Sequence, residues 1–145
     1  MSSENIELAR KAFDAFERRD LSQLEDLCQP DIEMDWSRRL IDPIVTRGYD
    51  GLRRFFEEIS GIFEEAVFEA EEVLEFEDKV LIVSTGHFRG KASGIEVKAR
   101  AANIWTIRDG KLARFCFYQS KEDALEDNPS LAEGLAERQT KRSSS

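Results

Sequence analysis

Few side chains in this sequence could carry proton-transfer or nucleophilic chemistry, and the candidates lie far apart along the chain. Asp35 ends a short alternating segment, Asn103 lies in the middle of a long one, and His87 is the only histidine. A carboxylate or an imidazole can act as a general acid or base, and a carboxamide can hold a ligand carbonyl or hydroxyl group. No Ser-His-Asp grouping and no Cys-His pair can be assembled.

Metal and cofactor sites are not expected from this composition. The two cysteines, Cys28 and Cys116, are isolated, and with a single histidine they offer no metal-ligand spacing. No glycine-rich phosphate loop is present in the sequence. We therefore expect no metal ion and no cofactor, and we expect both cysteines to be reduced core residues.

Two long alternating segments, residues 80–88 and 95–107, predict a hairpin that places Asn103 in a hollow. With a two-residue turn at residues 93–94, Asn103 lies opposite Ser84 on one face of the sheet. The middle of that face otherwise carries small residues: Gly86, Ala99 and Ala101. Small residues beneath Phe-rich helices would leave a concavity. Asn103 then either contacts a ligand or is an amide satisfied by Ser84 or by the backbone.

The elements that must position these residues come in a simple order. Apolar residues recur at helical spacing near residues 8–16, 21–28 and 52–63. A short strand near residues 32–36 precedes the third helix, and four strand-like segments follow residue 65. This order predicts an α+β fold in which three N-terminal helices pack on a curved antiparallel sheet. We assign residues 1–125 to this domain and residues 126–145 to a polar, partly disordered tail, with an amphipathic helical appendage near Leu125 and Leu131.

The opposite face of the same strands has apolar area too. It carries Leu81 and Ile104, and it becomes charged towards His87 and Arg100. Because the helices cover only one face, this outer face predicts a homodimer. With the turn above, His87 lies opposite Arg100, which favours an interface or surface role for the histidine over a catalytic one.

Composition and charge exclude some functions. The 145 residues include 21 Lys and Arg against 30 Asp and Glu, for a net charge of −9. This charge argues against nucleic acid and anionic membranes as partners. No apolar run approaches the roughly 18 residues of a membrane-spanning helix, and residues 1–5 are not typical of a signal peptide. A cytoplasmic protein is the expectation.

Several short motifs resemble the NTF2-like superfamily, which includes ketosteroid isomerases, SnoaL-type polyketide cyclases and limonene-type epoxide hydrolases. The likeness covers roughly residues 5–125, and the SnoaL-like proteins resemble the chain most. The motifs are AFDAF at 12–16, RDL at 19–21, PDI at 30–32, RGYDGLRRFF at 47–56 and NIWTIRDGKL at 103–112. The resemblance implies a cone-shaped fold with a pocket, on which unrelated activities occur.

The resemblance also allows a comparison of catalytic positions. The tyrosine, the general-base aspartate and the oxyanion-side aspartic acid of ketosteroid isomerases fall at Ala12, Trp36 and Asn103. The acidic residue of SnoaL-type cyclases falls at Gln119. Because neither Trp36 nor Gln119 can transfer a proton, both family mechanisms are disfavoured.

The last strand, near residues 112–118, has two possible registers. A two-residue turn at residues 109–110 directs Tyr118 towards the hollow, whereas a bulge at Gly110 directs Phe117 and Gln119 there instead. The resemblance favours the second register, since the cyclase residue at the Gln119 position belongs to the pocket.

Two hypotheses follow. The first is a protein that binds a small hydrophobic molecule without catalysis. The alternative is an isomerase, cyclase or hydrolase acting on a steroid-, polyketide- or terpenoid-like substrate by acid–base chemistry. The candidate catalytic residues are Asn103, Asp35 and Gln119. The candidate ligand-binding residues are Phe16, Trp36, Phe56, Ser84, Ala101, Trp105, Phe117 and Tyr118.

Overall fold

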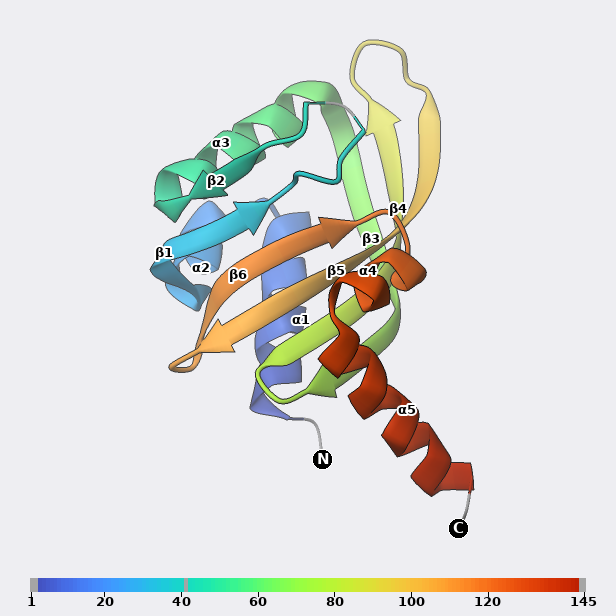
Figure 1. The fold of residues 1–145 in the computed structure, drawn as a ribbon. Coiled ribbons are helices and arrows are strands. Elements are labelled where there is room, and N and C mark those ends of the chain that lie inside the picture. Colours follow the sequence, from blue (N-terminus) through green and yellow to red (C-terminus); the bar gives the residue numbers. More distant parts are fainter. Residues whose placement is uncertain (1–2, 41, 144–145) are drawn as a thin grey trace.

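The computed structural model describes the backbone of residues 3–40 and 42–143, and side chains within that range up to residue 136. Five helices lie on the two faces of one six-stranded sheet (Figure 1). The helices are α1 (Glu4–Glu17), α2 (Leu21–Leu27), α3 (Gly48–Ile62), α4 (Lys121–Asp127) and α5 (Pro129–Ser143). The strands are β1 (Cys28–Asp35), β2 (Val45–Arg47), β3 (Phe63–Phe76), β4 (Lys79–Gly90), β5 (Glu96–Arg108) and β6 (Lys111–Tyr118).

The sheet has the strand order β2-β1-β6-β5-β4-β3. All neighbouring strands are antiparallel except β1 and β6, which run parallel, so the sheet is mixed and open. The helices α1, α2 and α3 cover its inner face (Figure 1). The predicted α+β cone is confirmed, and the parallel β1–β6 pair is its one departure from an antiparallel sheet.

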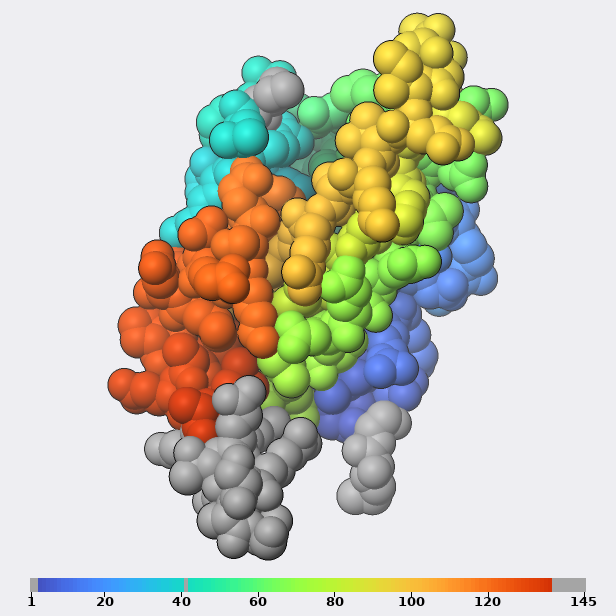
Figure 2. Space-filling view, turned by 90° about the vertical axis from the view of Figure 1, so that its right-hand side faces the viewer, coloured from blue at the N-terminus to red at the C-terminus, as the bar shows by residue number. Residues whose placement is uncertain are grey.

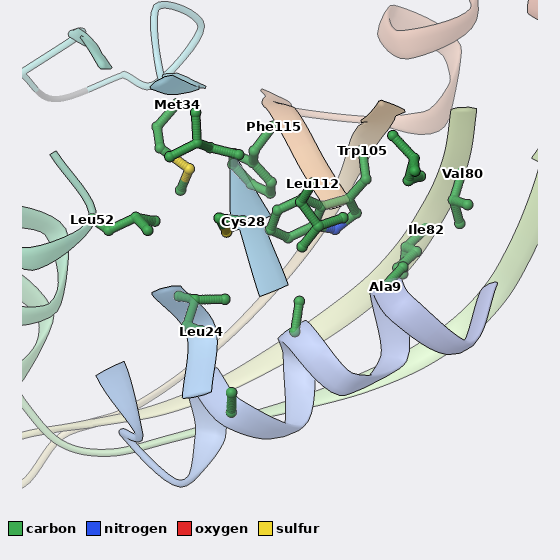
Figure 3. Packing of buried hydrophobic residues seen from close by; sticks show 14 of the residues in the cluster. Ala9, Leu24, Cys28, Met34, Leu52, Val80, Ile82, Trp105, Leu112 and Phe115 are labelled. Atoms are coloured by element: carbon green, nitrogen blue, oxygen red, sulfur yellow. The ribbon is translucent and has the colours of Figure 1, made fainter. Parts of the chain in front are cut away.

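Small residues allow α1 to approach the sheet closely. Its buried stripe is Ala9, Ala12 and Ala15, and the Ser3 hydroxyl caps its start by accepting from the Ile6 N–H at 3.0 Å. The inner core beneath the helices is a single cluster in which Leu24, Cys28, Leu52, Val80, Leu112 and Trp105 meet (Figure 3). This core holds the three N-terminal helices on the strands.

The outer face of the sheet has a cover within the chain. Leu81 and Ile104, together with Cys116, form a second core with Ala124 of α4 and Leu131 of α5. The apolar area that motivated the homodimer is therefore buried by the chain's own C-terminal helices. The homodimer itself stays a prediction, and so does the division into residues 1–125 and 126–145. Residues 144–145 of that predicted tail lie outside the described residues.

The two-residue turn predicted at residues 93–94 is wrong. Strand β4 ends at Gly90 and β5 begins at Glu96, and the Gly90 N–H donates to the Ile95 carbonyl at 3.1 Å, which closes a four-residue connection, residues 91–94. The pairing is consequently shifted by two residues, so Asn103 lies opposite Ile82 and His87 lies opposite Lys98. A shift by two preserves the face of every side chain, which explains why the inner and outer faces were still assigned correctly.

The last strand combines parts of both predicted registers. Arg108 pairs with Lys111 across a two-residue turn, in which Asp109 and Gly110 have φ values of 52° and 75°. The extra residue lies at Ala113, three residues beyond Gly110, since Ile107 pairs with Leu112 whereas Thr106 pairs with Arg114. Because of this bulge, Phe117 and Gln119 of the last segment face the inner side of the sheet, as the second predicted register required.

None of the described helices combines the length and apolar character needed to cross a membrane. Within the same described part of the chain, His, Cys, Asp and Glu form no group of three or more that could hold a metal ion.

Candidate functional site

A cavity of about 290 Å³ lies between the inner face of the sheet and the helices α1 and α3. Its walls are mostly aromatic and aliphatic, with small residues on the β4–β5 side. The lining residues that carry the argument below are Ala12, Phe16, Trp36, Phe55, Ser84, Gly86, Ala101, Asn103, Trp105, Phe115, Phe117 and Gln119. Figure 2 shows a recess in the surface between the cyan segment that follows β1 and the yellow to gold strand β5.

Gly86 lines the sheet side of the cavity, where the outer edge of the Phe88 ring lies over it. A Cβ atom at this position would lie 2.6 Å from that ring, so a larger residue here would displace the ring. Ser84 and Ala101 pair directly across β4 and β5, and they add no bulk to the same region. The hollow predicted from small side chains beneath aromatic rings is therefore present.

Stacked rings build the opposite wall. The Trp36 ring centroid lies 4.4 Å from that of Phe55 and 5.4 Å from that of Phe117, with interplanar angles of 22° and 28°. Phe16 of α1 contacts Phe55 at 5.1 Å. Rings fixed in this way offer a flat apolar surface to a ligand.

Three buried polar atoms on the lining residues have no hydrogen-bond partner among the described residues. They are Asn103 Oδ1, Trp105 Nε1 and Trp36 Nε1. Asn103 is 6% exposed and Trp105 is 4% exposed. The alternative in which Ser84 or the backbone forms the hydrogen bonds of the Asn103 amide therefore does not apply to the amide oxygen.

The structure brings eight of the sequence-predicted site residues around this one cavity. They are Phe16, Trp36, Ser84, Ala101, Asn103, Trp105, Phe117 and Gln119. Phe56 is buried in the inner core and does not line the cavity, whereas its neighbour Phe55 does. Helical spacing identifies the apolar stripe of α3, but it does not show which of two adjacent rings points towards the hollow. Met34 and Arg39 also line the cavity and were missed.

Asp35 does not line the cavity, which corrects its place among the catalytic candidates. Strand alternation directs it to the outer face, where its carboxylate accepts from Arg114 Nη2 at 2.8 Å and from the Ser37 N–H at 2.9 Å. Burial opposes ionisation, but the Ser37 hydrogen bonds and the charges of Arg114 and Arg38 prevail and lower the pKa of Asp35. Asp35 is therefore an ionised structural carboxylate.

The ionisation of Asp35 predicts a pH-dependent contribution to stability. A lowered folded-state pKa means that the contribution is present above the unfolded pKa near 3.8 and is lost as the pH falls through the folded value. Asp35→Asn should therefore lower the free energy of unfolding by about 1 kcal/mol at pH 7. In urea unfolding, the difference from the parent protein should shrink at pH 3. A difference of the same size at both pH values would contradict this assignment.

Tyr118 also lies outside the cavity and needs the same correction. It faces the outer core, where its hydroxyl donates to Asp127 Oδ2 at 2.6 Å and accepts from Asn128 Nδ2 at 3.1 Å. Burial, followed by the bond to Asp127, raises the pKa of Tyr118. The bulge at Ala113 is the cause of this placement. Tyr118 therefore anchors the C-terminal helices and does not contact a ligand in the cavity.

Three of the lining residues carry long polar side chains. Gln119 donates from Nε2 to the Arg38 carbonyl at 2.8 Å. The Arg39 guanidinium lies 5.7 Å from the Trp36 ring centroid and pairs with Glu58 at 3.5 Å. Arg100 pairs with Glu71 at 3.0 Å. Among the described lining residues, the two arginines are the only ones with an ionisable side chain.

The three positions compared with ketosteroid isomerases all lie at the cavity. Ala12, Trp36 and Asn103 are lining residues. None of the three can donate and regain a proton at neutral pH. What the arrangement offers a ligand is apolar contact, ring stacking and hydrogen bonds.

Comparisons with known proteins agree with this fold. The SnoaL-like domain family matches residues 9–115. No curated protein matches the chain significantly. An NTF2-like protein of unknown function from Burkholderia pseudomallei is 17% identical, with 86% of this chain and 97% of that chain covered and a TM-score of 0.71.

Two further similar structures contain ligands. TerC, co-crystallised with polyporic acid, is 21% identical, with 86% of this chain and 97% of that one covered and a TM-score of 0.73. A Mycobacterium tuberculosis protein in complex with estradiol-17beta-hemisuccinate is 13% identical, with 84% and 98% covered and a TM-score of 0.71. Identities this low establish a shared fold and no more.

Proposed function

The chain belongs to the SnoaL-like domain family, and from this membership we propose that it binds a small, mainly apolar molecule in the cavity beneath α1 and α3. The observation that carries the proposal is the cavity itself. It measures about 290 Å³ and is lined mainly by apolar residues. A few polar atoms of the lining could form hydrogen bonds that orient a ligand. If this space were only a part of the core, larger side chains that filled it would increase the stability of the protein.

The shape of the walls supports a flat ligand. Trp36, Phe55 and Phe117 form a stacked aromatic surface on one side, and small residues leave space opposite it. A ring system between these surfaces would gain stacking in addition to apolar burial. The ligands in the complexes of TerC and of the Mycobacterium tuberculosis protein are reasonable first probes for this chain.

The alternative is an isomerase, cyclase or hydrolase of the SnoaL-like kind. Such chemistry needs a group that transfers a proton within hydrogen-bond reach of the substrate. Among the described lining residues the only ionisable side chains are those of two arginines, a residue type that does not serve as a general base. The cavity therefore favours binding over acid–base catalysis. A homodimer and a cytoplasmic location stay predictions from the sequence.

Thermal shift tests the proposed function directly. Polyporic acid, estradiol-17beta-hemisuccinate and a terpenoid panel are added to the full chain. A ligand at 100 times its Kd adds about 2.7 kcal/mol to the free energy of unfolding. For a domain of this size, that raises Tm by roughly 10 °C. Flat melting curves with every apolar ring compound would reject the proposal. Turnover of a bound compound would instead establish the enzymatic alternative.

A further inference from the structure

The charge of the cavity lining is opposite to that of the whole protein. The sequence carries 30 Asp and Glu against 21 Lys and Arg. The described lining residues nevertheless include two arginines and neither Asp nor Glu. A carboxylate brought into the cavity therefore meets no acidic side chain on these walls, whereas a cation finds no carboxylate on them to pair with. The lining consequently favours an anionic ligand over a cationic one.

Of the two arginines, Arg39 is the one whose charge lies at the aromatic wall. Arg100 precedes Ala101 on β5, and strand alternation turns its side chain to the outer face, where it pairs with Glu71 at 3.0 Å. The Arg39 guanidinium lies 5.7 Å from the ring centroid of Trp36, which is a lining residue. The Arg39 side chain is only 20% exposed. Its charge is therefore less screened by water than that of a surface arginine.

Backbone geometry holds Arg39 beside this wall. The Arg39 N–H donates to the Trp36 carbonyl at 3.1 Å, so a single turn leads from the indole to the arginine. Gln119 Nε2 donates to the Arg38 carbonyl in the same turn at 2.8 Å, and Arg39 Nη2 donates to the Asp42 carbonyl at 2.7 Å. The turn begins the cyan segment beside the recess in Figure 2. A guanidinium held in this way needs little ordering when a ligand binds.

The carboxylate next to Arg39 is one that a ligand can replace. Glu58 Oε1 lies 3.5 Å from Arg39 Nη1, beyond the roughly 2.7–3.2 Å of a hydrogen bond. Glu58 lies three residues after Phe55 on α3, so both side chains point to the same side of the helix. Because Glu58 is 38% exposed, its carboxylate can turn to water. A ligand carboxylate in its place would form charge-assisted hydrogen bonds with the guanidinium.

We propose that the cavity takes an amphipathic anion, an apolar ring compound with one carboxylate, and that this carboxylate replaces Glu58 on the Arg39 guanidinium. The ring stacks on Trp36 while the acid group stays at the edge of the aromatic wall. This inference rests on the proposed function, and it adds the chemical class of the ligand. Arg39 is then a specificity-determining residue.

Two matched probes, 2-naphthoate and 2-naphthamide, test the inference by calorimetric titration of the full chain at pH 7.5. They share a ring system and a planar substituent and differ in charge. 2-Naphthoate should bind about tenfold more tightly than 2-naphthamide, because its hydrogen bonds to Arg39 are charge-assisted. Arg39→Gln should remove this preference and leave 2-naphthamide binding unchanged. Glu58→Gln should act in the opposite direction and strengthen 2-naphthoate binding roughly threefold, since the competing carboxylate is gone.

Arg53→Gln is the matched control. Arg53 lies on α3, its side chain is 54% exposed, and it is not a lining residue. The variant loses the same charge as Arg39→Gln, and both affinities should stay unchanged. A contact between Arg39 and Glu58 that only fixes the loop would make Arg39→Gln and Glu58→Gln alter both probes in the same direction. That result would refute the inference.

The outcomes separate this inference from the proposed function. Equal affinity of the parent protein for both probes would refute the preference for an anion and leave the proposed function standing. A preference that persists in Arg39→Gln would refute the assignment to Arg39. If neither probe binds, the inference is refuted, and the thermal-shift panel with its neutral terpenoids decides separately on the proposed function. Circular dichroism confirms the fold of each variant, and Glu58→Gln carries the test if Arg39→Gln does not fold.

Discussion

Ala101→Trp is expected to abolish ligand binding while the protein stays folded. Ala101 lies opposite Ser84 and lines the cavity, so an indole at this position would extend into the hollow. We expect the affinity for any apolar ring compound to fall at least 100-fold, since the indole would occupy the ligand's place. The free energy of unfolding should change by less than about 2 kcal/mol, because the ring enters existing space. Calorimetric titration and urea unfolding measure the two effects.

Ala92→Trp is the matched control for this variant. Ala92 is exposed in the connection between β4 and β5, outside the cavity lining. The same substitution there should leave both affinity and stability unchanged. If Ala101→Trp binds ligands as well as Ala92→Trp does, the ligand site lies elsewhere on the protein.

The sheet shows which features alternation predicts and which it does not. A period of two assigned Ser84, Ala101 and Asn103 to one face, and this face is the inner one. The pairing partners were wrong because they depend on the length of the connection, and the sequence SG at 93–94 is compatible with both a two-residue and a four-residue connection. Face assignment survived because the error was an even number of residues.

Features that depend on tertiary packing were harder to predict. The bulge at Ala113 has no local signal in the sequence, yet it decides that Gln119 and not Tyr118 faces the cavity. The choice between Phe55 and Phe56 depends on the rotation of α3 over the sheet. The cover of the outer face was missed for a similar reason, since the apolar positions of the C-terminal segment are few and widely spaced.

The second large effect is a loss of stability expected for Leu131→Asp, because Leu131 belongs to the C-terminal helices that cover the outer face. Leu131 of α5 is 1% exposed and packs in the outer core with Leu81 and Ile104. The substitution removes a buried aliphatic side chain and places a carboxylate there, which should cost at least about 3 kcal/mol. This is a large share of the roughly 5–15 kcal/mol that stabilises a typical domain. Urea unfolding at pH 7 measures the loss.

Leu40→Asp is the control, because Leu40 is 86% exposed and the same change there should cost less than about 0.5 kcal/mol.

Light scattering measures the oligomeric state of both variants. If α5 seals the outer face, Leu131→Asp should associate into larger species as that apolar face becomes accessible, whereas Leu40→Asp should keep the parent mass. Equal stability of the two variants would mean that α5 does not pack there in solution. The outer face would then be free for the second subunit that its apolar residues first suggested.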